Sequence, residues 1–110
     1  MAGKFELKMT ESGKYMFNLK AGNGQIILVS QMYESKDSAE NGIESVRKNS
    51  ADDARFERKV AKNGEPFFSL TATNGQNIGK SETSSRESAM ENGVESVKTN
   101  APDAEVVDNT

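Results

Sequence analysis

The sequence has no cysteine and no histidine among its 110 residues, and these absences remove several kinds of chemistry. Without cysteine there is no disulfide, no thiolate nucleophile and no zinc site of the cysteine and histidine type. Without histidine a Ser-His-Asp triad lacks its general base. The sequence therefore disfavours an enzyme without excluding one, and we expect no catalytic residue, no cofactor and no bound metal.

Long apolar runs are also absent. The longest, Ile26–Val29, is far shorter than the roughly 20 residues that a membrane-spanning helix needs. No apolar signal segment follows Met1, so we expect a soluble cytoplasmic protein that does not associate with membranes. A formal net charge of −3 disfavours general binding to nucleic acid, although a local basic patch stays possible.

Acidic side chains recur one helical turn apart, at Glu40 with Glu44 and at Glu91 with Glu95. Such pairs can contribute to a Mg²⁺ or Ca²⁺ site, but these cations need about six oxygen ligands and no further ligand stands at a suitable spacing. We interpret both pairs as the solvated flank of a helix. None of the nine glycines forms a phosphate-binding loop motif.

The chain contains an internal repeat. When residues 5–55 are aligned without gaps against residues 56–106, 20 of the 51 pairs are identical. The shared strings include ENGIESV from Glu40 and ENGVESV from Glu91, and such self-similarity indicates duplication of one supersecondary unit. The sequence predicts a single domain, 1–110, made of two repeats at about 4–55 and 56–108.

Each repeat begins with three segments that favour strands, at 4–9, 15–21 and 26–30 in the first copy. The first two alternate apolar and polar residues, as half-buried strands do. Asn23-Gly24, which recurs at Asn74, predicts a type I′ hairpin turn. Short turns between the segments indicate an antiparallel meander.

A helix is expected next, at about Ser35–Lys48, because Ala39, Ile43 and Val46 form one apolar stripe. Asn49, like Asn100 in the second copy, is expected to end the helix in a left-handed conformation. A final short strand then closes each copy, starting at Ala54 and Ala104.

No linker separates the repeats. The string ARFERKVA from Ala54 is expected to be both the last strand of the first copy and the first strand of the second. The simplest arrangement is an α+β fold with one shared antiparallel sheet and two helices on one of its faces.

Gly42 and Gly93 lie inside the two expected helices, where glycine costs about 1 kcal/mol relative to alanine. We favour close backbone approach between helix and sheet, or between the two helices, as the reason, and a ligand lying against the helix is the alternative.

Two tandem copies of a unit with NGQ between its strands and ENG[IV]ESV in its helix resemble the YegP-like bacterial family over residues 4–108. The resemblance implies tandem β-β-β-α-β units in one combined sheet with exchanged terminal strands. It implies no established activity, cofactor or catalytic residue. Two copies in one chain supply what a dimer would otherwise provide, which favours a monomer.

The sheet face away from the helices is the candidate partner surface, because it combines lysines with outward apolar side chains. A small non-catalytic module that binds a protein or peptide is the favoured function. Single-stranded nucleic acid, bound by stacking and charge, is the alternative. The residues expected on this surface are Lys8, Met16, Asn18, Lys20, Lys59, Phe67, Ser69 and Thr71.

Overall fold

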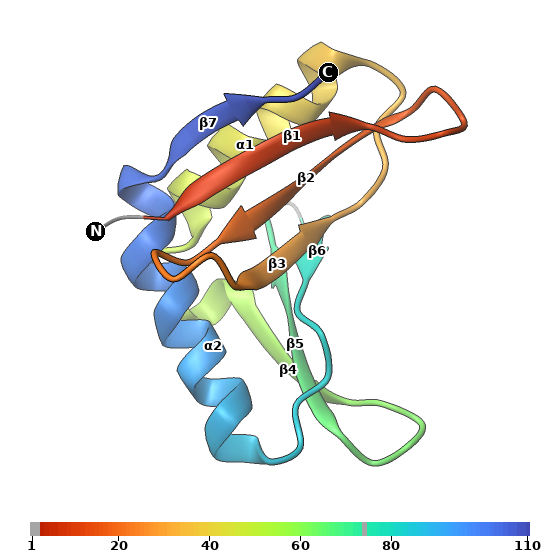
Figure 1. Cartoon of the computed structure of the whole chain (residues 1–110). Coiled ribbons are helices and arrows are strands. Elements are labelled where there is room, and N and C mark those ends of the chain that lie inside the picture. The colour runs from red at the N-terminus through yellow and green to blue at the C-terminus, as the bar shows by residue number, and fades with distance from the viewer. Residues whose placement is uncertain (1–2, 74) are drawn as a thin grey trace.

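A computed structural model describes residues 3–73 and 75–110, and these residues form one seven-stranded sheet with two helices packed against it (Figure 1). The first repeat contains β1 (Lys4–Met9), β2 (Tyr15–Lys20), β3 (Ile26–Ser30), α1 (Lys36–Asn49) and the 3-10 turn η1 (Asp53–Arg55). The second contains β4 (Phe56–Val60), β5 (Pro66–Thr71), β6 (Asn77–Lys80), α2 (Glu87–Asn100), the 3-10 turn η2 (Ala101–Asp103) and β7 (Glu105–Asp108).

The two repeats meet in the middle of the sheet, whose strand order is β4-β5-β6-β3-β2-β1-β7. There β3 and β6 run antiparallel, with Val29 opposite Lys80. These two residues are repeat equivalents, so a pseudo-twofold axis passes between the two strands. The predicted tandem-repeat α+β fold with one shared sheet and two helices is confirmed.

The last strand of the second repeat completes the first repeat, as exchanged terminal strands require. β7 lies beside β1 with Val106 opposite Phe5, and the two strands are parallel. The expectation of a purely antiparallel sheet is therefore wrong, and the sheet is mixed. The reason is that α2 returns the chain to the end of the sheet where β1 begins (Figure 1).

The prediction that β4 is shared as the last strand of the first repeat is also wrong. Among the described strands β4 pairs only with β5, and it forms the far edge of the sheet. The residues equivalent to β7 are Ala54–Glu57, and these residues belong to the end of η1 and the start of β4. No separate strand is left to close the first copy.

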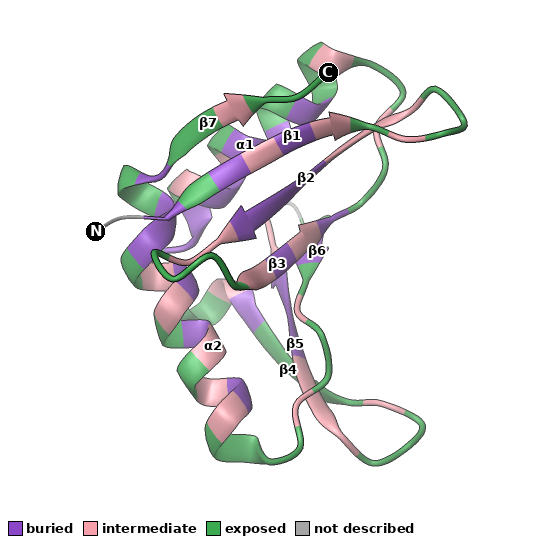
Figure 2. Ribbon diagram, viewed as in Figure 1, coloured by how far each residue is buried: buried purple, intermediate pink, exposed green. Residues whose placement is uncertain are grey.

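Buried residues of the strands and of both helices form one continuous hydrophobic core. Figure 2 shows these buried positions in purple along the ribbon. Phe5 meets Phe17 edge to face with ring centroids 5.8 Å apart, and the equivalent rings of Phe56 and Phe68 are 5.7 Å apart. The predicted stripe of α1 is buried in this core. Within the described residues, no helix is long and apolar enough to cross a membrane.

Two local predictions fail for a common reason, namely that positive φ angles occur only at glycines among the described residues. Gly24 has φ of 87° but Asn23 does not, so the β2–β3 turn is a three-residue loop with a glycine bulge and not type I′. Asn74, its equivalent, lies outside the described residues.

Asn49 stays in the right-handed helix, and its side-chain Nδ2 donates to the backbone oxygen of Ser45 at 2.8 Å. Asn100 does the same with Ser96. The predicted left-handed caps are therefore wrong, because both helices continue into a tight turn.

Candidate binding surfaces

All eight predicted surface residues lie on β1, β2, β4 and β5 and point away from the helices. Strand register places Lys8 opposite Met16 and Lys59 opposite Phe67, each alternating with core residues such as Phe68. Two of the eight are almost fully buried, since Asn18 is 4% exposed and Ser69 is 1% exposed. A partner could therefore reach only the other six without rearrangement, namely Lys8, Met16, Lys20, Lys59, Phe67 and Thr71.

The six accessible residues do not converge on one point. Met16 belongs to the half of the sheet built from β1–β3, and Phe67 belongs to the half built from β4–β6. The strands β3 and β6 separate β2 from β5. The predicted surface is thus two pseudo-symmetric patches on one face.

A hollow of about 580 Å³ makes the Phe67 patch the more developed of the two. We call it the Phe67 groove. Its apolar wall comes from Phe67, Val29 and Ala61, and its rim carries Lys80 and Glu82. Val29 and Lys80 were missing from the sequence prediction because their neighbourhood arises only when β3 of one repeat pairs with β6 of the other.

Several lysines of the open face are already paired with carboxylates. Lys20 Nζ lies 2.9 Å from Glu6 Oε2, and this hydrogen bond lowers the pKa of Glu6. Lys8 also contacts Glu6, at 3.7 Å, while Lys59 lies 3.8 Å from Glu57. The Lys8 and Lys59 pairs are exposed at one or both ends, so each adds little to stability, whereas the Lys20–Glu6 pair is half-buried at both ends.

Lys80 differs from these lysines. It is exposed at the rim of the Phe67 groove, and it forms no ion pair with any residue that the structure describes. Glu82 lines the same groove, but the ammonium of Lys80 forms no ion pair with it, so a lysine beside an apolar wall is suited to a partner that presents an acidic group next to an apolar one.

The hydroxyl of Ser81, on the rim of the Phe67 groove, has a structural role. Its Oγ accepts from the backbone N–H of Phe68 at 3.1 Å and donates to the backbone oxygen of Glu82 at 3.0 Å. Ser30 does the same in the first repeat. Among the described residues, no three Asp or Glu side chains are grouped so that they could hold one metal ion.

The helix glycines allow close packing against aromatic rings. A Cβ on Gly42 would lie 2.5 Å from the hydroxyl oxygen of Tyr33 and 3.0 Å from the ring of Phe17. A Cβ on Gly93 would lie 3.0 Å from the ring of Phe68. The packing interpretation of both glycines is confirmed, and the close neighbours are side chains.

Comparison with known proteins shows where this fold occurs. The family described as "Domain of unknown function (DUF1508)" matches residues 11–57 and 61–108, once for each repeat. A UPF0339 protein of Bordetella pertussis is 56% identical over 110 residues, covering 100% of this chain and 98% of its own length. A UPF0339 protein of Pseudomonas aeruginosa is 52% identical over 108 residues, covering 98% of each.

Two solution NMR structures have the same fold. The protein of unknown function yegP from E. coli superposes with a TM-score of 0.95 at 48% identity, covering 100% of this chain and 95% of that one. A UPF0339 protein of Shewanella oneidensis superposes with a TM-score of 0.93 at 44% identity, covering 98% and 92%.

Proposed function

The chain belongs to the DUF1508 family, and we propose that it is a non-catalytic binding module that takes an extended peptide segment of a protein partner in the Phe67 groove. The observation that carries the proposal is the combination of an apolar wall with the unpaired cation of Lys80. The partner segment would insert an apolar side chain beside Phe67 and place a carboxylate on Lys80.

The groove has the chemistry of a peptide site and lacks that of a strand of nucleic acid. Single-stranded nucleic acid binds by stacking successive bases on aromatic side chains and by neutralising phosphates. On the described open face Phe67 provides one aromatic ring, and its repeat equivalent is Met16. Lys8, Lys20 and Lys59 already have carboxylate neighbours. These features favour a peptide.

The proposal includes where and in what form the chain works. We propose a cytoplasmic monomer that folds as one domain, because each repeat supplies the strand that the other repeat needs at the centre of the sheet. β3 and β6 pair across the pseudo-twofold axis, and β7 pairs with β1. Both contacts would otherwise require a second subunit.

Selection from a random peptide display library tests the proposal. The enriched peptides should share an apolar residue next to aspartate or glutamate, and fluorescence anisotropy should give them micromolar affinity. Phe67→Ser and Lys80→Glu should each weaken binding by at least about tenfold, since they remove the two central contacts.

Met16→Ser is the matched control, because Met16 is the repeat equivalent of Phe67 on the same face. It should leave affinity unchanged. Equal losses for Met16→Ser and Phe67→Ser would contradict a groove-centred site. Preferential binding of single-stranded oligonucleotides over the selected peptides would replace the peptide proposal with the nucleic-acid alternative.

A further inference from the structure

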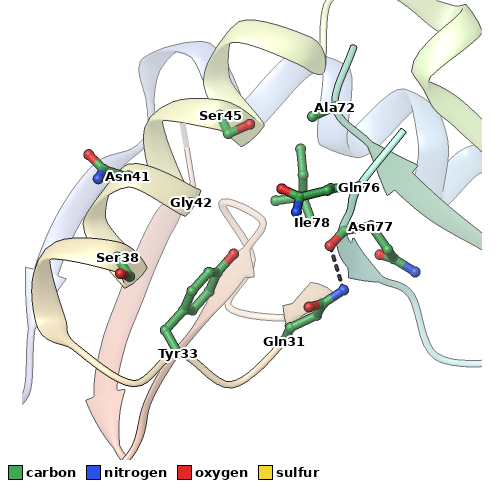
Figure 3. A pocket seen from close by; sticks show the side chains of 10 residues that line it. All are labelled: Gln31, Tyr33, Ser38, Asn41, Gly42, Ser45, Ala72, Gln76, Asn77 and Ile78. Atoms are coloured by element: carbon green, nitrogen blue, oxygen red, sulfur yellow. Dashed lines mark hydrogen bonds between the residues drawn. The ribbon is translucent and has the colours of Figure 1, made fainter. Parts of the chain in front are cut away.

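A second hollow lies on the helix side of the sheet, far from the face that the proposed function uses. It has a volume of about 620 Å³ and opens between α1 of the first repeat and the β5–β6 hairpin of the second (Figure 3). We call it the α1 cleft. Its size falls within the range of pockets that hold small organic ligands, about 300–1,000 Å³.

Tyr33 is held firmly at the mouth of this cleft. Its backbone exchanges two hydrogen bonds with Tyr15, at 2.8 and 2.6 Å, and its ring stacks on Phe17 with a centroid separation of 6.2 Å. The hydroxyl end lies against Gly42 and points into the cleft (Figure 3). Among the described residues this hydroxyl has no hydrogen-bond partner, so it can donate to a ligand.

The rest of the lining is polar but uncharged. Ile78, Ala72 and Gly42 provide a small apolar floor. Hydroxyls and carboxamides surround them, and Figure 3 shows the amide of Gln76 directed into the space and the side-chain amide of Asn77 directed away from it. Gln31 Nε2 donates to the backbone oxygen of Asn77, which ties the two sides of the mouth together. No aspartate, glutamate, lysine or arginine lines the cleft in the described part of the chain.

The pseudo-twofold axis supplies an internal comparison. The equivalent groove of the second repeat, between α2 and the β2–β3 hairpin, has a volume of only about 130 Å³. There Ile26 stands at the position of Asn77, and Ser84 stands at the position of Tyr33. Both grooves keep the helix glycine and its aromatic neighbour, so packing alone does not account for the polar lining of the α1 cleft.

We propose that the α1 cleft binds an uncharged nitrogen heterocycle of the nucleobase type, as a free base or a nucleoside. Such a molecule has an apolar ring face for the floor of Ile78 and Ala72. Its edge carries adjacent hydrogen-bond donors and acceptors, which side-chain carboxamides recognise in pairs, as asparagine and glutamine do with adenine. The uncharged lining gives a phosphate or carboxylate no compensating charge.

The matching of groups is specific. Tyr33 donates one hydrogen bond from a hydroxyl whose pKa is raised by burial, so the group stays protonated at neutral pH. Gln76, whose side-chain amide points into the cleft, carries both an N–H₂ donor and a carbonyl acceptor. A sugar, in contrast, displays hydroxyls all around its ring and offers less apolar surface to the floor.

Backbone amide shifts of the ¹⁵N-labelled chain test this inference with six named probes: adenine, uracil, adenosine, uridine, AMP and glucose. The four neutral heterocycles should give saturable shifts at Tyr33, Gly42, Ser45 and Asn77, with Kd of about 0.1–1 mM. AMP should bind no more tightly than adenosine, and glucose should leave these amides unchanged.

Gln76→Leu replaces the amide that points into the cleft with an apolar group of similar size and should weaken binding by at least about tenfold. Tyr33→Phe removes only the hydroxyl and should weaken binding about fivefold while the fold is kept. The matched control is Gln25→Leu, which makes the same change in the other groove and should leave the Kd unchanged.

Three results would overturn the inference: no saturable shift with any heterocycle, equal shifts with glucose, or full affinity in both Gln76→Leu and Tyr33→Phe. If Gln76→Leu fails to fold, Tyr33→Phe decides the matter. Peptide binding in the Phe67 groove is measured on the other face of the sheet, so either proposal can fail while the other stands.

Discussion

Gly42→Ala and Gly93→Ala make the same change at equivalent helix positions, yet we expect different results. Alanine improves helix propensity by about 1 kcal/mol in both cases, since neither glycine has a positive φ. At Gly93 the new methyl meets the ring of Phe68 at 3.0 Å, which a small shift of the ring relieves. The free energy of unfolding of Gly93→Ala should stay within about 1 kcal/mol of wild type.

At Gly42 the new methyl would lie within 3.0 Å of three atoms, whereas at Gly93 it lies that close to one atom only. The nearest are the Tyr33 hydroxyl oxygen at 2.5 Å and ring carbon Cζ at 2.8 Å, and Phe17 lies at 3.0 Å. Tyr33 must leave its position, which costs the stacking on Phe17 and part of the packing, about 1–3 kcal/mol together. Because both variants gain the same helix propensity, that gain cancels, and Gly42→Ala should be less stable than Gly93→Ala by about 1–3 kcal/mol.

Urea unfolding of both variants measures this difference, and a third variant identifies its cause. Tyr33→Ser gives the first repeat the residue of the second, at Ser84. In that background Gly42→Ala keeps only the Phe17 contact, so its effect should fall to that of Gly93→Ala. The reasoning is refuted if the two single variants are equally stable, or if the cost of Gly42→Ala is the same with and without Tyr33.

Three further predictions follow from burial and charge. Phe68→Ala should lower the free energy of unfolding by about 3–5 kcal/mol because the ring is 1% exposed. Phe67→Ala should lower it much less because that ring is half-buried. Equal losses of melting temperature in the two variants would contradict the assignment of faces. Arg58 and Lys98 lower the pKa of Asp53 to about 2, so its ionised form stabilises the fold above about pH 4 and this contribution is lost as the pH falls to about 2. Asp53→Asn should be less stable than wild type at pH 6 and should show a shallower loss in acid unfolding over that range, and parallel curves would contradict this. Because the repeats share one sheet and one core, urea unfolding followed by circular dichroism and by tyrosine fluorescence should give one coincident transition; two separate transitions would show that the repeats unfold independently.

The sequence was informative wherever a local pattern is enough. The alternation around Phe17 and the stripe of Ala39, Ile43 and Val46 predicted both the elements and the faces that they bury. The 51-residue register predicted two equivalent units in one sheet. These features depend on the periodic spacing of apolar residues, which can be read directly from the sequence.

Strand direction and turn detail were not predictable in this way. The string EVVD at Glu105–Asp108 is compatible with a strand of either direction, so the parallel pairing with β1 left no local signal. Asn23 and Asn49 are residue types that tolerate positive φ. In the β2–β3 turn, however, Gly24 takes the positive φ, and Asn49 keeps a right-handed conformation because a tight turn follows the helix directly.

The candidate sites were partly predictable for a similar reason. Phe67 and Lys59 are neighbours in one hairpin, so their shared surface could be inferred. Lys80 meets Val29, and Tyr33 shares a cleft with Gln76, only after the two repeats pair. These pairs combine residues 51 and 43 positions apart and leave no pattern within either segment.

The position of β7 has a consequence for biosynthesis. Among the described strands the ribosome makes β7 last and its neighbour β1 first, and Asn109 N–H donates to the backbone oxygen of Leu7 at 2.8 Å. The outer backbone of β1 thus stays without its partner strand until all the other strands and both helices have been made. A nascent chain stalled before Ala104 would expose that strand to chaperones or to neighbouring nascent chains.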